Sequence, residues 1–236
     1  MITLPQDWHV FDNADSVAQK TVEAILEIAK TAIDERKAFH LVTAGGTTPL
    51  AVYRLLAERE TKDNKSLIEW SKWHIYMGDE RCVPTDDTQR NSLALHEAWL
   101  KFSKIPKDQI HYMPAELGAE QAAKAYESTV SGIEFDVVLL GMGEDGHTAS
   151  LFPGRNHEAE AGRLVQTEFH SPKPPPERVT LSQECLSHCR HQIKLVTGKA
   201  KAEAVEKWLA GEELPIAQAK GKQTLVFISQ ESLPQV

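Results

Sequence analysis

The sequence predicts an α/β fold: one domain over residues 1–236, with a mainly parallel, twisted sheet and helices on both faces. Short apolar runs alternate with amphipathic stretches of helical length, which is typical of βαβ units with right-handed crossovers. The run Val137–Leu140 is apolar throughout and precedes glycines, as expected of a strand covered on both faces. With 236 residues, 41% of them hydrophobic and 25% charged, the chain can build a full core.

The elements follow from periodicity and from helix and turn signals. Residues 14–36 carry apolar side chains at spacings of three and four, which predicts a helix with Asp15 or Ser16 as its cap. Pro49 is expected to open a second helix over residues 50–59, because a first turn tolerates proline. We expect the other helices at 92–102, 119–130 and 199–209, and strands at 39–42, 73–77, 136–140, 162–169, 179–181, 192–196 and 224–228.

Composition narrows the class of function. The formal net charge of −8 argues against nucleic acid as a partner. The first residues contain no basic segment followed by an apolar one, and no apolar stretch approaches the ~20 residues that cross a bilayer. Three cysteines give no disulfide framework and suit a reducing compartment. We therefore expect a cytoplasmic protein without a membrane partner, as a monomer or small homo-oligomer.

The loop Thr43–Pro49, which reads TAGGTTP, is suited to hold an anion. Two adjacent glycines let backbone N–H groups converge, threonines add hydroxyls, and the following helix contributes the positive end of its dipole. The alternative is that the glycines serve only a tight turn. The spacing of GxxxxGK[ST] and of GxGxxG is missing, so neither a nucleotide P-loop nor a dinucleotide site is indicated.

Ionisable residues follow two of the expected strands. In Gly143-Glu144-Asp145-Gly146-His147, the histidine can act as a general base and the aspartate can orient it, while the glycines suggest close approach of the backbone to a ligand. The strand at 73–77 is followed by three charged residues, Asp79, Glu80 and Arg81. Three such charges are either a solvated turn or part of a site.

Two isolated cations and one cysteine–histidine group have competing explanations. Arg178 is a surface charge by default, whereas Lys201, in the first turns of a helix, is better explained by a bound anion. The group Cys185, His188, Cys189 and His191 departs from paired C-x₂-C spacing, and ordinary cysteines on a helix face account for it without a metal.

Taken together, the loops resemble the 6-phosphogluconolactonases, within the larger family that includes glucosamine-6-phosphate deaminases and isomerases. The resemblance implies their Rossmann-like fold, and the third motif is closer to the lactonases than to the deaminases. One departure is Arg90-Asn91-Ser92, where many relatives have a serine–asparagine pair. The matching segments are TAGGTTP (43–49), GDERCVP (78–84), GMGEDGHTASLFPG (141–154), RVTLS (178–182) and TGKAKAEA (197–204).

The resemblance implies a single sugar-phosphate-binding catalytic domain that hydrolyses 6-phospho-D-glucono-1,5-lactone, in the oxidative pentose phosphate pathway, with no cofactor and no metal. His147 would activate water, Asp145 and Asp79 would shape its hydrogen bonding, and Arg81 would orient or stabilise charge near the reacting centre. The residues implied to hold the phosphate are Gly45, Gly46, Thr47, Thr48, Arg178 and Lys201. The chemistry agrees, because lactone hydrolysis needs water, a base and groups that face an oxyanion.

Two alternatives stay open. A glucosamine-6-phosphate isomerase or deaminase would use Asp79 to move a proton between carbons and His147 to assist ring opening. A non-catalytic sugar-phosphate sensor would need a DNA-binding module, but the first long helix begins near Ala14 and the chain is acidic. An assay of lactone hydrolysis separates these three functions.

Overall fold

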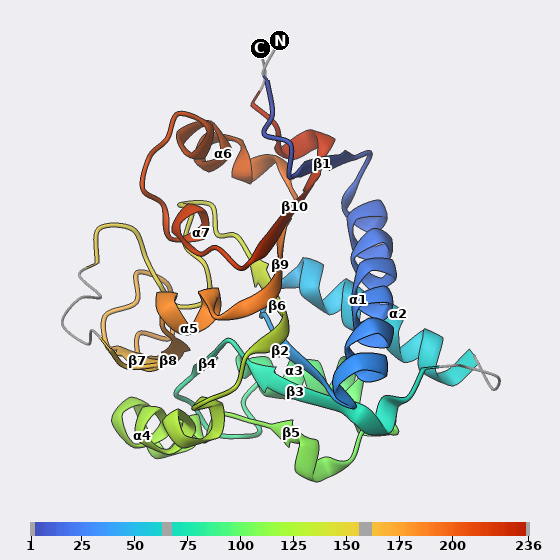
Figure 1. Cartoon of the computed structure of the whole chain (residues 1–236). Coiled ribbons are helices and arrows are strands. Elements are labelled where there is room, and N and C mark those ends of the chain that lie inside the picture. Colours follow the sequence, from blue (N-terminus) through green and yellow to red (C-terminus); the bar gives the residue numbers. More distant parts are fainter. Residues whose placement is uncertain (1–2, 63–67, 156–161, 235–236) are drawn as a thin grey trace.

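A parallel sheet forms the centre of the computed structural model, which describes residues 3–62, 68–155 and 162–234. Its seven strands are β1 (Trp8–Phe11), β2 (Phe39–Thr43), β3 (Trp73–Met77), β5 (Ile110–His111), β6 (Phe135–Gly141), β9 (Cys189–Val196) and β10 (Gln223–Ser229). They lie in the order β1-β10-β9-β6-β2-β3-β5, and every neighbouring pair is parallel (Figure 1). The predicted parallel sheet is thus confirmed.

A smaller antiparallel sheet, which the sequence did not predict as such, contains three short strands. These are β4 (Asp79–Arg81), β7 (Val165–Glu168) and β8 (Arg178–Leu181), in the order β4-β8-β7. Strand β4 pairs Asp79 with Thr180 and Arg81 with Arg178. This pairing joins two of the sequence motifs, although they are about a hundred residues apart in the chain.

Helices cover both faces of the large sheet, as predicted. The helices α1 and α2 pack against each other on one face, whereas α4, α5 and the small sheet lie on the other side (Figure 1). The helices are α1 (Ala14–Arg36), α2 (Thr47–Lys62), α3 (Asn91–Ala98), α4 (Ala119–Val130), α5 (Gln183–Ser187), α6 (Ala202–Leu209) and α7 (Pro215–Gln218).

The first helix has the predicted bounds but a different cap. The side chain of Asn13 accepts a hydrogen bond from the N–H of Ser16 at 2.9 Å, and its backbone is extended, with φ −157° and ψ 177°. An N-cap residue needs this extended backbone. Asp15 and Ser16 already lie inside the helix, so the prediction that one of them is the cap was wrong.

Two predicted helices are interrupted, and the cysteine–histidine segment is divided. The helix expected at 92–102 ends at Ala98 and is followed by a 3₁₀ turn at Leu100–Phe102, while residues Lys199–Lys201 form a 3₁₀ turn before α6. The helix α5 ends at Ser187 and β9 begins at Cys189, so the expected single helix face for the cysteines was wrong. In the part of the chain that is described, no three metal-ligating side chains gather at one point.

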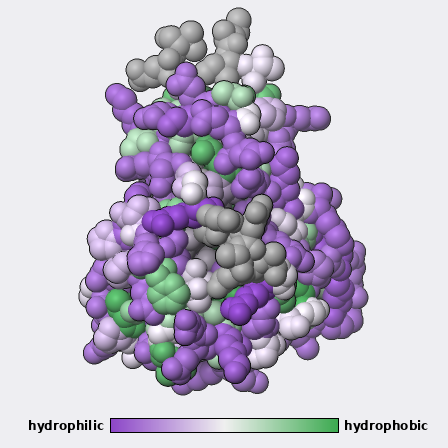
Figure 2. Space-filling model, turned by 90° about the vertical axis from the view of Figure 1, so that its left-hand side faces the viewer, coloured by the Kyte–Doolittle hydropathy of each residue, from purple (hydrophilic) through white to green (hydrophobic). Residues whose placement is uncertain are grey.

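The apolar side chains of the sheet and helices form one hydrophobic core. The face in Figure 2 is mainly hydrophilic, and its hydrophobic residues are scattered rather than gathered. Within the described ranges, no helix has the length and apolar character to span a bilayer.

The chain changes direction between β2 and β6, which are neighbours in the sheet. From β2 the chain continues to β3 on one side, whereas from β6 it continues, by way of the small sheet, to β9 on the other side. The two segments that leave these strands therefore diverge and leave a crevice at the carboxyl ends. Ligands of open α/β sheets bind at such a switch point.

Candidate active site

A cavity of about 330 Å³ lies at this switch point, at the carboxyl ends of β2, β3, β6 and β9. Nine of the ten site residues predicted from the sequence line it, and the tenth, Asp145, contacts one of the nine. Asn91, Lys173 and Thr197 also line it, and they were not among the predicted site residues. The predicted residues at the cavity wall are Gly45, Gly46, Thr47, Thr48, Asp79, Arg81, His147, Arg178 and Lys201.

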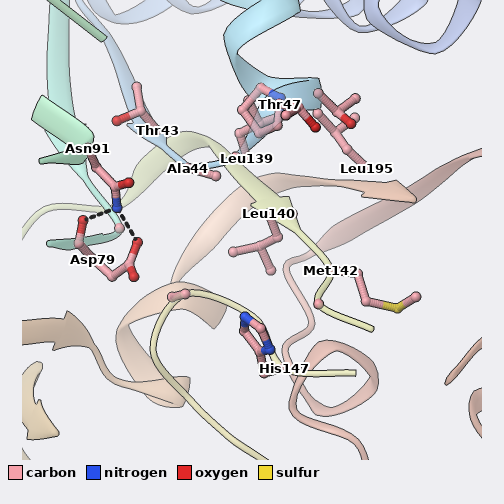
Figure 3. A pocket seen from close by; sticks show the side chains of 18 of the residues that line it. Thr43, Ala44, Thr47, Asp79, Asn91, Leu139, Leu140, Met142, His147 and Leu195 are labelled. Carbon is pink, nitrogen blue, oxygen red and sulfur yellow. Dashed lines mark hydrogen bonds between the residues drawn. The ribbon is translucent and has the colours of Figure 1, made fainter. Parts of the chain in front are cut away.

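His147 and Asp145 form a pair at the edge of this cavity. The Nδ1 atom of His147 lies 2.5 Å from Oδ1 of Asp145, and the same oxygen accepts the backbone N–H of His147 at 3.3 Å. A proton on Nδ1 that is held by the carboxylate leaves Nε2 with its lone pair. In Figure 3 the imidazole lies across the open centre of the cavity from Thr47 and Asp79.

Gly143 has no side chain, and the imidazole of His147 occupies the space where a Cβ atom would lie. A Cβ atom at Gly143 would lie 2.0 Å from Nδ1 of His147 and 2.7 Å from Oδ1 of Asp145. The glycine is therefore needed for the approach of a side chain of the same loop. Gly143 also lines the cavity, so the prediction that the glycines let the backbone approach a ligand stays a prediction.

Burial and charge act in opposite directions on the pair. Burial lowers the pKa of His147 below its usual value of 6.5, although the charge of Asp145 and the hydrogen bond to it act to raise it. The pKa of Asp145 is lowered: burial acts to raise it, but the interaction with His147 outweighs this. At neutral pH the imidazole is thus an uncharged base beside an ionised carboxylate.

Asp79 is held by two side chains that come from distant parts of the sequence. Its Oδ1 accepts from Nδ2 of Asn91 at 3.1 Å, and its Oδ2 accepts from the hydroxyl of Ser150 at 2.7 Å. A Cβ atom at Gly45 would lie 2.3 Å from Oδ1 of Asn91, so the glycine provides the room for this amide. The negative charge of Asp79 acts to raise the pKa of His147. Figure 3 shows the hydrogen bonds between Asp79 and Asn91 as dashed lines.

The neighbouring carboxylate of Glu80 has a structural role instead. Successive side chains of a strand point to opposite sides, so Glu80 faces away from Asp79. Its Oε1 accepts the N–H of Asn91 at 2.8 Å, and its Oε2 accepts the N–H of Ser92 at 2.8 Å, at the beginning of α3. Glu80 therefore satisfies two orphan donors of that helix and fixes the position of Asn91.

The glycine–threonine loop opens α2 at the edge of the cavity. The helix begins at Thr47, three residues earlier than predicted, and the first bond of its ladder runs from the N–H of Leu50 to the carbonyl of Gly46. The hydroxyl of Thr48 hydrogen-bonds that of Thr197, which follows β9. A helix start of this kind presents backbone N–H groups and a positive dipole to an anion.

Four cations line the cavity: Arg81, Lys173, Arg178 and Lys201. Burial lowers the pKa of Arg178 and that of Lys201, although acidic neighbours act to raise both. Lys201 ends the 3₁₀ turn that precedes α6, near the predicted place at a helix start. Together with the loop at α2, these cations make the cavity suited to a substrate with an anionic group.

Comparison with known proteins identifies the family of this site. Residues 12–227 match the model of the family described as glucosamine-6-phosphate isomerases/6-phosphogluconolactonase. The chain belongs to this family. The 6-phosphogluconolactonase of Mycobacterium leprae (strain TN) is 34% identical over 238 residues, which cover 94% of this chain and 94% of that protein. The resemblance drawn from the sequence motifs is therefore confirmed.

Solved structures of the family share the fold. The crystal structure of 6-phosphogluconolactonase from Thermotoga maritima aligns with a TM-score of 0.84 and 30% identity, and the alignment covers 94% of this chain and 99% of that one. A monomeric glucosamine-6-phosphate deaminase aligns with a TM-score of 0.82 at 19% identity, over 96% of this chain and 98% of that one. At that identity the deaminase shows the shared fold alone and does not decide the reaction.

Proposed function

We propose that this family member hydrolyses 6-phospho-D-glucono-1,5-lactone to 6-phospho-D-gluconate in the oxidative pentose phosphate pathway. The names of the curated relatives support a lactone-hydrolysing enzyme. The observation that carries the proposal is the pair formed by Asp145 and His147, at a cavity that also holds a helix N-terminus and four cations. The sugar phosphate would bind in a single catalytic domain.

In the first step, Nε2 of His147 takes a proton from a water molecule as the water oxygen attacks the lactone carbonyl carbon. Asp145 holds Nδ1–H, which fixes the tautomer and stabilises the imidazolium that forms. The lowered pKa of His147 keeps the imidazole uncharged at neutral pH, so that it can accept the proton. Neither a metal nor an organic cofactor is needed for this proton transfer.

In the second step, the tetrahedral intermediate collapses. The bond between the carbonyl carbon and the ring oxygen breaks, and the imidazolium returns its proton to that oxygen, which becomes a hydroxyl group. The acid product then ionises to a carboxylate. His147 thus serves first as base and then as acid, with no net change in its protonation.

The phosphate would anchor the substrate far from the reacting carbon. We assign it to the loop of Gly45, Gly46, Thr47 and Thr48 together with Lys201, and Arg178 adds positive charge to the same cavity. Anchoring a remote group fixes the carbonyl against the water and so reduces the entropic part of the barrier. Asp79 and Arg81 would orient the ring from the opposite wall.

Hydrolysis of freshly generated lactone tests the proposal, with the spontaneous rate subtracted. We expect clear acceleration by the wild-type protein, and a fall in kcat of about 10²-fold or more for His147→Ala with a modest change in KM, since general base catalysis contributes that much. Lys201→Ala should mainly raise KM. If the protein instead releases ammonia from glucosamine 6-phosphate without accelerating lactone hydrolysis, the deaminase function is correct and ours is wrong.

A further inference from the structure

A fourth cavity cation, Lys173, belongs to none of the motifs that carried the family resemblance. It lies in the proline-rich loop of residues 171–176, and Lys173 and Pro174 line the same cavity as His147 and Lys201. By sequence this loop is a connection between two strands of the small sheet. Its place at the cavity follows from the pairing of β7 with β8, which turns the loop over the carboxyl ends of the large sheet.

The backbone of this loop is fixed by Arg178. Its Nη2 donates to the carbonyls of Lys173 at 2.9 Å and Pro174 at 3.2 Å, and its Nε donates to the carbonyl of Pro175 at 3.1 Å. The hydroxyl of Ser171 donates a further bond to the carbonyl of Lys173 at 2.7 Å. Two nitrogens of Arg178 thus donate hydrogen bonds to the loop, and the loop holds Lys173 at a defined point of the cavity wall.

The ammonium of Lys173 is free to meet a ligand. Among the residues that the structure describes, none accepts a hydrogen bond from its Nζ or forms an ion pair with it, whereas Arg81 donates Nη1 to the carbonyl of Gln89 at 2.7 Å. The charge of Lys173 also lowers the pKa of His147 and that of Lys201.

We propose that Lys173 is a catalytic residue whose ammonium stabilises the negative charge on the lactone carbonyl oxygen, and that Arg178 positions it through the loop carbonyls. This inference rests on the proposed lactone hydrolysis. The phosphate already has Lys201 and the N-terminus of α2, so we assign the further cation of the cavity that His147 lines to the reacting end of the substrate. The carbonyl oxygen lies one bond from the carbon that the water attacks, and it is therefore close to the water held by His147.

The charges balance in this step. As the water oxygen bonds to the carbonyl carbon, the π electron pair moves to the carbonyl oxygen, and the proton of the water moves to Nε2 of His147. The oxyanion then lies beside the ammonium of Lys173, which keeps its three protons throughout. When the carbonyl re-forms and the ring C–O bond breaks, the negative charge leaves that oxygen and the electrostatic contact weakens.

The test compares Lys173→Met with the matched variant Lys199→Ala. Lys199 is an exposed lysine near Lys201 that does not line the cavity, so its replacement removes one positive charge from the same region. We expect Lys173→Met to lower kcat by about 10²-fold with KM changed less than about threefold, as for loss of one oxyanion donor. Lys173→Arg, which keeps the charge, should recover part of the lost kcat, and Lys199→Ala should behave as wild type.

A pH profile of kcat/KM gives a second test, because replacing a lysine with a purely structural role would leave the profile unchanged. The positive charge of Lys173 lowers the pKa of His147, so Lys173→Met should raise it and shift the acidic limb to higher pH. Arg178→Met should lower kcat too, but it should lower kcat little further in the Lys173→Met background, because Arg178 acts on kcat through the loop. The positive charge that Arg178 adds to the cavity should appear in KM instead.

The outcomes separate this inference from the proposed function. A wild-type protein that does not accelerate lactone hydrolysis overturns the function itself. An active wild-type protein, with normal kcat and an unshifted acidic limb in Lys173→Met, overturns only the role of Lys173. A raised KM with normal kcat would instead place Lys173 at the phosphate. Fully additive effects of Lys173→Met and Arg178→Met on kcat would rule out positioning by Arg178.

Discussion

Replacing Gly143 with alanine tests the proposed catalytic role of the pair His147 and Asp145 without removing either side chain. The new Cβ atom would lie 2.0 Å from Nδ1 of His147, whereas ordinary contacts begin near 3.4 Å, so the imidazole must move by about 1.4 Å (3.4 − 2.0). The same Cβ would lie 2.7 Å from Oδ1 of Asp145. Gly143 is not among the residues with positive φ, so alanine can adopt its backbone and the effect should be confined to the pair.

The expected result is a large loss of turnover in a folded protein. A misplacement of about 1 Å can cost about 10²-fold in rate, so we expect kcat of Gly143→Ala to fall by at least that factor. Steady-state lactone hydrolysis, corrected for the spontaneous reaction, measures this loss, and thermal unfolding checks that the fold persists. The control is Gly143→Ala combined with His147→Ala, which should lose nothing beyond His147→Ala alone, because the displaced group is absent.

Two outcomes for Gly143→Ala would refute the expected loss of turnover. If Gly143→Ala keeps near wild-type kcat and a normal melting temperature, the close approach of Gly143 to the imidazole has no part in catalysis. A variant that unfolds at room temperature would also contradict it, since the steric conflict is with two side chains at the cavity edge rather than with the core. The outcome therefore bears directly on the role of the pair.

Two further predictions concern pH. Because burial lowers the pKa of His147, the acidic limb of kcat/KM should lie below pH 6.5. Asp145→Asn removes a charge that acts to raise this pKa, so it should move the limb to still lower pH while kcat falls. A limb at or above pH 6.5 in the wild-type protein would contradict this prediction. Lys194 is 1% exposed over the ring of Trp208, and burial lowers its pKa from 10.5 to about 7. Between these two pKa values the unfolded chain binds more protons than the folded one, so the free energy of unfolding in urea should rise from pH 7 to pH 10. Lys194→Met should flatten this rise and stabilise the protein at pH 7. An unchanged slope in Lys194→Met would refute the second prediction.

Strong periodic signals in the sequence were enough to predict the long helices and the place of the main motifs. The bounds of α1, β3 and α4 were predicted residue for residue, because helical periodicity and a short, mostly apolar run are local properties of the sequence. The motifs also had to meet, since parallel strands end at one edge of a sheet. That rule is enough to bring Gly45, Asp79 and His147 to one cavity without any knowledge of their contacts.

The contacts between side chains of different loops depend on how the chain packs, and they could not be predicted from the sequence. Asn91 and Ser150 hold Asp79 from 12 and 71 residues away, and no local pattern encodes such a contact. Lys173 reaches the cavity because Arg178 anchors a loop that by composition is only proline-rich. Short strands such as β5, with two residues, also carry too little periodicity to be predicted, because their stability comes from the neighbouring strand rather than from their own sequence.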